Sequence, residues 1–259
     1  MTYCVGIRIR QGLVALADGR VTTGSQMASA RKVTLFGEDP HRFFIMTSGL
    51  RSVRDKVLAY LAHDQDLTTD HSFARMLDAV GDFTDCLRRV AKEDEEALAK
   101  SDLTFNLHAI IGGQLSQDRQ PTMFLVYPEG NWIEVDERTP YLSIGATTYG
   151  KPILDRALSY DTEIRHALKL AYLSFDSTRF SSTDVGFPID MLSYSVEDRR
   201  WREDHFAYDD LVDERQWWNR NITELAERMP DGPWARSLLA GSDDRVTAFP
   251  SAVSDDPDR

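Results

Sequence analysis

The chain opens with two short apolar runs, TYCVGIRIR at residues 2–10 and QGLVALAD at residues 11–18. In the first run apolar and other residues alternate with a period of two, which is typical of a β-strand. Gln11-Gly12, between the runs, is a tight-turn pair. The sequence therefore predicts an N-terminal β-hairpin, whose first strand ties the chain terminus into a sheet.

Thr2 is the first residue of this hairpin and directly follows Met1. If Met1 is removed, the Thr2 hydroxyl can act as a nucleophile with its own α-amine as the base, so that no histidine is needed. An unperturbed α-amine has a pKa of about 7.7–8.0, and a nearby cation would lower that pKa further. Lys32 is the candidate cation, and Asp18, at the end of the second strand, is the candidate to hold Lys32 in place.

Short motifs in the same region resemble the proteasome β-subunit family. They are Thr2, residues 12–18, Arg20, Gly24, Lys32 and Ser48-Gly49-Leu50. Two later runs, residues 149–156 and 174–178, are closer still to Anbu, the bacterial proteasome-related peptidase family. The resemblance is spread over about residues 2–230. It implies an N-terminal nucleophile hydrolase that self-assembles, as a homo-oligomeric ring or helical assembly, in the cytoplasm and without a cofactor.

The order of predicted elements gives the same fold class. Strand patterns up to Gly49 precede two helices with apolar faces at residues 50–65 and about 72–100. Strands at 106–112, 123–127, 132–135 and 141–144 precede two more helices at 149–160 and about 161–175, and residues 187–194 return to strand. We therefore expect an α+β fold, a four-layer αββα sandwich with two face-to-face sheets and a helix pair on each outer side. Residues 19–30 are expected to form a loop.

The expected domain organisation is a hydrolase domain at residues 1–199 and a C-terminal helical extension and tail at 200–259. The extension contains four of the five tryptophans and an expected acidic helix at 209–229. Aromatic enrichment favours packing contacts, either on the same domain or between subunits. The last stretch, residues 242–259, is polar and is expected to lie outside the packed fold.

Further site residues follow from local position or from the resemblance. Gly49 comes between a strand and a predicted helix, where its backbone N–H is a candidate oxyanion donor. The resemblance implies an Asp and a Ser shortly after the fourth helix. Asp176 is the best match for the Asp, and Ser177, Ser181 and Ser182 compete for the Ser. Proteasome β subunits also carry Gly-Ser-Gly before the third helix, whereas this chain has Gly-Ala-Thr-Thr at 145–148, so Thr147 is a substitute or the role is unfilled.

Composition excludes several other classes of function. The net charge of −12 argues against nucleic acid and anionic membranes as partners, and no apolar run approaches membrane-spanning length. The two cysteines form no CxxC pair and the six histidines show no metal-ligand spacing, so no metal site is expected. The expected substrate is a peptide or another amide. The alternatives are a non-peptidase amidase on the same scaffold and a non-catalytic assembly protein, which the missing serine near Ala146 would favour.

Overall fold

A computed structural model of the chain describes residues 2–23, 26–66 and 73–239. Four features of the sequence therefore lie outside the described residues: Met1, Gly24, the expected helix start at Ser72 and the polar stretch 242–259. The structure divides into two compact units, residues 1–212 and 213–259.

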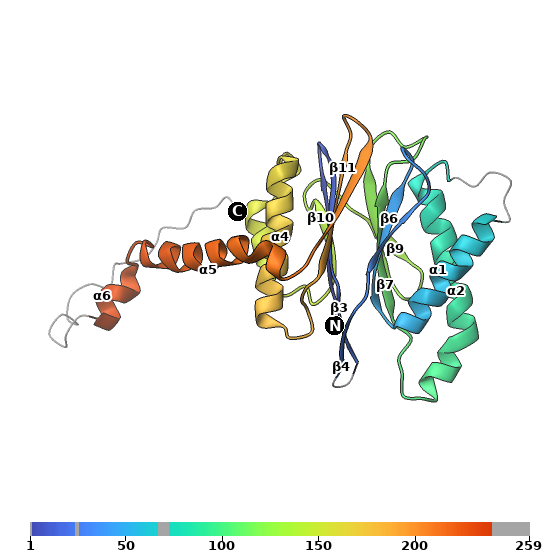
Figure 1. Ribbon diagram of the computed structural model, residues 1–259, viewed down its shortest axis with the longest axis horizontal. Helices are drawn as coiled ribbons and strands as arrows, with labels where there is room; N and C mark the ends of the chain where they lie inside the picture. Colours follow the sequence, from blue (N-terminus) through green and yellow to red (C-terminus); the bar gives the residue numbers. More distant parts are fainter. Residues whose placement is uncertain (1, 24–25, 67–72, 240–259) are drawn as a thin grey trace, which may run out of the picture. The chain divides into compact units, whose positions relative to one another are not determined.

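The first unit contains two five-stranded antiparallel sheets, which lie face to face in Figure 1. The first sheet has the order β10-β1-β2-β11-β12, with β1 (Tyr3–Ile9), β2 (Gly12–Asp18), β10 (Tyr141–Gly145), β11 (Ile189–Ser195) and β12 (Arg200–Phe206). The second sheet has the order β5-β6-β7-β8-β9, with β5 (Val33–Phe36), β6 (Phe43–Gly49), β7 (Leu107–Gly113), β8 (Thr122–Val126) and β9 (Trp132–Glu134).

Each sheet carries a helix pair on its outer face (Figure 1). The second sheet is covered by α1 (Arg51–Asp66) and α2 (Met76–Ala99), and the first by α3 (Lys151–Ala157) and α4 (Ile164–Ser181). Three buried apolar clusters fill the spaces between these layers, one under each helix pair and one between the sheets. The expected αββα sandwich is therefore confirmed.

The N-terminal hairpin is present, but its turn is one residue earlier than predicted: Arg10 and Gln11 form the turn, and Gly12 is the first residue of β2. Ile9 lies opposite Gly12 and Cys4 opposite Ala17, so the strands pair along their whole length. Tyr3, Val5 and Ile7 point to the helix side, whereas Cys4 belongs to the core between the sheets. Both faces of β1 and β2 are buried because the sheet is covered on both sides.

Two regions differ from the sequence expectation. Residues 19–30 contain a small β-ribbon of β3 (Arg20–Thr23) and β4 (Gln26–Ser29) rather than a loop. Residues 200–206, expected to begin the helical extension, form β12 at the edge of the first sheet. Only Trp201 of this strand is buried, so the charged sequence gives no clear strand pattern, and pairing with β11 decides its conformation.

The second unit contains most of α5 (Val212–Glu227), which follows a short 3₁₀ turn at Asp209–Leu211, and all of α6 (Pro233–Leu239). Among the helices of the described residues, none has both the length and the apolar content that a membrane span requires.

Candidate active site

A buried carboxylate organises the end of the first sheet where the chain begins. Asp18 Oδ1 accepts a hydrogen bond from the Tyr3 backbone N–H at 2.8 Å and another from Lys32 Nζ at 2.7 Å. One oxygen atom thus contacts both the peptide group that joins Thr2 to Tyr3 and the ammonium of Lys32. Among the candidate residues from the sequence, the structure brings together the start of the chain, Asp18 and Lys32.

Lys32 is held from two further directions. Its Nζ donates to the Arg20 carbonyl oxygen at 2.6 Å, and its own carbonyl oxygen accepts from the Thr47 N–H at 3.2 Å. The side chain is 6% exposed. Because most of the ammonium is removed from water, its position is fixed by these partners rather than by solvation.

The surroundings of Asp18 shift the pKa of its carboxyl group in opposite directions. Burial raises the pKa of the Asp18 carboxyl, while Lys32 and the N–H groups of Tyr3 and Gly186 act to lower it. All three of these neighbours donate hydrogen bonds, at distances of 2.7, 2.8 and 3.4 Å. A carboxylate only accepts hydrogen bonds, so the contacts match the ionised form of Asp18.

Thr2 is positioned by a backbone hydrogen bond to the segment after β10, and the next residue, Tyr3, is held by α4. The Thr2 carbonyl oxygen accepts from the Ala146 N–H at 2.7 Å. Gly145 has a φ of +88°, and a Cβ on it would lie 1.8 Å from that same oxygen, so only glycine fits. The Tyr3 hydroxyl donates to Ser174 Oγ at 2.9 Å inside the helix layer. The stretch that includes Thr147 therefore lies directly beside Thr2.

Gly49 lies at the end of a strand, not at the start of a helix as expected. It is the last residue of β6, opposite Leu107, and α1 begins at Arg51. Its φ is +139°, and a Cβ would approach the Asn106 carbonyl oxygen to 2.1 Å. Gly49 is exposed and lies two residues after Thr47, on the strand that holds the Lys32 backbone.

The structure contradicts the expected place of Asp176. Helix α4 continues to Ser181, so Asp176 lies within the helix rather than after it, and its Oδ1 pairs with Arg179 at 2.6 Å. Ser177 and Ser181 also lie within α4, and Ser182 caps its C-terminal end. No described contact joins Asp176 to Thr2, Asp18 or Lys32. The sequence LSFDSTRFSS has no Gly or Pro to stop the helix earlier.

The segment that does reach Asp18 from this side is the loop after α4. Gly186 donates to Asp18 Oδ2, and the Arg20 guanidinium donates to the Thr183 carbonyl oxygen at 2.8 Å. Arg20 packs so closely on Gly186 that a Cβ there would lie 2.4 Å from its guanidinium carbon. No local pattern in the sequence predicts this role of Arg20 and Gly186; the only available signal is the isolated glycine after the helix.

A cavity of about 220 Å³ borders Lys32 between β5, β6 and α1. Its lining includes Thr34, Ile45 and Thr47 from the strands and Arg54 from the helix. Within residues 2–23, 26–66 and 73–239, no group of three or more His, Cys, Asp or Glu side chains is arranged to hold a metal ion.

Comparisons with known proteins identify relatives over most of the chain. No protein-family model matches it. Proteasome subunit beta 1 of Pyrobaculum calidifontis is 22% identical over 200 residues, which cover 76% of this chain and 92% of that protein. A solved structure of a mutant Anbu from Hyphomicrobium sp. strain MC1 is 31% identical, with a TM-score of 0.81, over 90% of this chain and 99% of the other. The helical assembly of the Anbu complex from Pseudomonas aeruginosa is 30% identical, with a TM-score of 0.82, over 90% and 99%. The chain therefore belongs to the Anbu family, whose members have the fold of proteasome β subunits.

Proposed function

We propose that this chain is a threonine-type peptidase or amidohydrolase in which Thr2, freed by removal of Met1, is the N-terminal nucleophile. The observation that carries the proposal is the Asp18 oxygen that accepts from both the Tyr3 N–H and Lys32 Nζ. A purely structural chain terminus has no need of a buried ammonium held against its second residue. Membership of a proteasome-related family supports the same chemistry.

In this mechanism the Thr2 hydroxyl oxygen attacks the carbonyl carbon of a peptide or other amide bond. The α-amine of Thr2 accepts the hydroxyl proton and then delivers it to the leaving amine as the C–N bond breaks. The product is an ester between Thr2 and the acyl group. Water, activated by the same amine, hydrolyses this ester and restores the hydroxyl.

The other residues have supporting roles in the proposal. The Lys32 ammonium stabilises the developing alkoxide electrostatically, and Asp18 holds that ammonium in place. The Gly49 N–H is the proposed oxyanion donor, a contribution of about 2.7–4 kcal/mol to the transition state where such donors have been removed. The cavity beside Lys32 receives a substrate side chain.

Cys4 is the other nucleophilic side chain near the buried pair. Its thiol is fully buried between the sheets, and burial, together with the charge of Asp18, raises its pKa. A thiol that stays protonated and has no access to solvent is a poor nucleophile. This leaves Thr2, which is only partly buried, as the residue that can meet a substrate.

A non-catalytic assembly protein is the second candidate, and specific observations favour it. Ala146 occupies the position where the proteasome pattern has a serine, and Asp176 is paired with Arg179. Both observations remove supporting groups from the site, but neither affects the contacts between Asp18, Lys32 and the start of the chain.

We also propose that the chain self-assembles and that α5 contributes to the contact between copies. One face of this helix carries Trp218, Ile222 and Leu225, and Met229 follows two residues after its end; the last three are about half exposed or more in the single chain. Large apolar side chains at this spacing form one stripe, which a soluble helix normally buries. The helical assembly of the Pseudomonas aeruginosa relative supports self-assembly of this chain.

The nucleophile is tested by two substitutions at one position. We expect Thr2→Ala to lower the turnover of short fluorogenic peptides by about 10³-fold or more, because it removes the attacking oxygen. Thr2→Ser keeps a hydroxyl and should retain measurable turnover. Equal rates for the wild-type protein and Thr2→Ala would refute the threonine mechanism, and turnover of small amides but not of peptides would identify an amidase.

The buried pair is tested by a double-mutant cycle followed by urea unfolding. Lys32→Met should lower the free energy of unfolding by about 3–5 kcal/mol, because it leaves the Asp18 charge buried without a partner. Adding Asp18→Asn should recover part of that loss, since the unpaired charge is then gone. All these variants should lose peptidase activity, including the double variant with its partly recovered stability. Simple additivity of the two substitutions would show that the pair is not coupled.

The assembly surface is tested by sedimentation velocity at several protein concentrations. We expect Leu225→Asp to shift the protein towards smaller species, because it puts a charge into the proposed contact. Glu224→Gln changes the neighbouring exposed residue and should leave the distribution unchanged. Identical distributions for wild type and Leu225→Asp would argue against α5 as a contact surface.

A further inference from the structure

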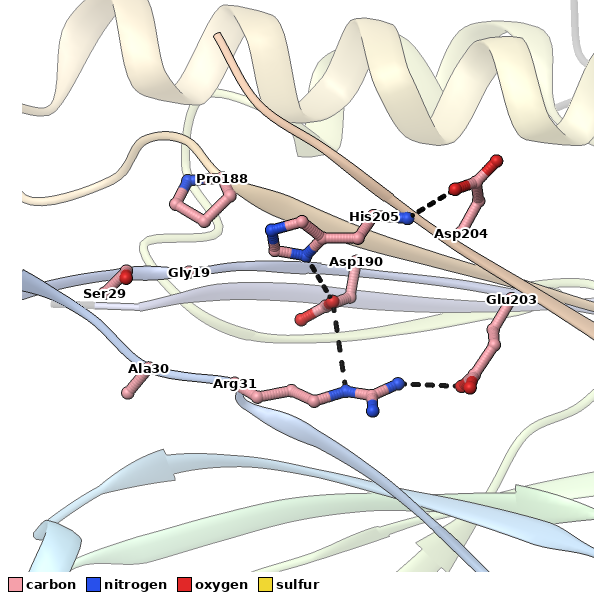
Figure 2. A pocket seen from close by; sticks show the side chains of 9 residues that line it. All are labelled: Gly19, Ser29, Ala30, Arg31, Pro188, Asp190, Glu203, Asp204 and His205. Carbon is pink, nitrogen blue, oxygen red and sulfur yellow. Dashed lines mark hydrogen bonds and ion pairs between the residues drawn. The ribbon is translucent and has the colours of Figure 1, made fainter. Parts of the chain in front are cut away.

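A second cavity, of about 460 Å³, is lined in part by β11 and β12. β11 is the strand next to β2, which ends at Asp18. Figure 2 shows its lining, with Gly19, Ser29, Ala30 and Arg31 on one side and side chains of β11 and β12 on the other. In the sheet register Ile189 lies opposite Asp18, and Asp190 lies opposite Ala17. Asp18 and Lys32 do not line the cavity themselves, but their neighbours in the chain do: Gly19 follows Asp18, and Arg31 precedes Lys32.

Asp190 is the most deeply buried charged group in this cavity, with 4% of its surface exposed. Its Oδ1 contacts His205 Nδ1 at 2.9 Å and lies 3.9 Å from Arg31 Nε. Arg31 is bound more closely to Glu203, at 2.7 Å. Among the described residues nothing donates a hydrogen bond to Asp190 Oδ2, which Figure 2 shows directed away from His205 and Arg31.

Besides Asp190 Oδ2, the cavity has a second hydrogen-bond acceptor, Nε2 of His205. A carboxylate has no proton to give, so the proton in the contact with Asp190 is carried by Nδ1 of His205. In the neutral imidazole Nε2 is then a hydrogen-bond acceptor, and none of the described residues donates a hydrogen bond to it. The His205 side chain is 60% exposed, so this nitrogen is accessible from the cavity.

The balance of charge selects the kind of ligand. Two carboxylates, Asp190 and Glu203, face the cavity with one guanidinium, Arg31. Asp204 points the other way in Figure 2, where its carboxylate accepts from the His205 backbone N–H. A buried carboxylate without full compensation is costly, and a ligand that brings a positive charge and several N–H donors would remove that cost.

We propose that this cavity binds a cationic nitrogen group, the guanidinium or ammonium of an Arg or Lys side chain in the substrate. The group donates to Asp190 Oδ2 and to His205 Nε2, and its charge compensates Asp190. The identity of the ligand as a substrate side chain rests on the proposed peptidase function. The cavity is then a specificity subsite on the β11 side of Asp18, separate from the cavity that borders Lys32 on the α1 side.

The binding test uses a charged compound and its neutral isostere with the full chain. In NMR titrations, N-acetyl-arginine amide should bind at least tenfold more tightly than N-acetyl-citrulline amide. Asp190→Asn should weaken the binding of the arginine compound at least tenfold. Asp85→Asn removes an equal charge from an exposed position on α2 and should leave the binding unchanged.

Equal binding of the two compounds, or full retention of arginine binding by Asp190→Asn, overturns the proposal. A thermal melt of each variant checks that it is folded. If Asp190→Asn does not fold, His205→Ala provides the same test at a largely exposed side chain, and unchanged arginine binding by that variant overturns the proposal.

Cleavage of a peptide library separates this inference from the proposed function. Wild-type protein should enrich Arg or Lys at one fixed position relative to the cleaved bond, and Asp190→Asn should abolish that enrichment. Cleavage without any preference for basic residues overturns the subsite and keeps the peptidase. Arginine binding that depends on Asp190, in a protein that cleaves no peptide, confirms the cation site and overturns the peptidase.

Discussion

The buried ion pair of Asp18 and Lys32 is the constraint on which the proposed active site depends. Two charges removed from water are stable only when their remaining hydrogen-bonding capacity is used. Here the Tyr3 and Gly186 N–H groups donate to Asp18, and the Arg20 carbonyl oxygen accepts from Lys32. These hydrogen bonds hold the start of β1, the start of β3 and the loop after α4 in one arrangement. The peptide group that joins Thr2 to Tyr3 and the Lys32 ammonium then share one oxygen of Asp18.

Much of this arrangement could be predicted from the sequence because it depends on local patterns. The period-two run predicts the hairpin, although its turn lies at Arg10-Gln11, one residue before the predicted pair. The observed register brings Asp18 next to Tyr3. The parts that could not be predicted depend on distant partners. Gly186 meets Asp18 across 168 residues, and β12 is a strand because it pairs with β11. Asp176 was misplaced because nothing in the local sequence marks the end of α4.

One short segment links the two sites of the molecule. Lys32 forms a buried ion pair with Asp18 of β2. Its neighbour Arg31 forms ion pairs with Glu203 of β12 and Asp190 of β11. The proposed chemistry and the proposed selectivity for a basic side chain thus depend on consecutive residues. Because both sites share this segment, a change in either pair of contacts is expected to affect the position of the other.

The proposed mechanism requires that the free α-amine of the mature protein belongs to Thr2. Intact mass spectrometry of the protein, produced without an N-terminal tag, tests this most directly. For a threonine peptidase we expect a mass that corresponds to a chain beginning at Thr2. If every molecule retained Met1, the Thr2 hydroxyl would have no amine base beside it, and the threonine mechanism would be wrong.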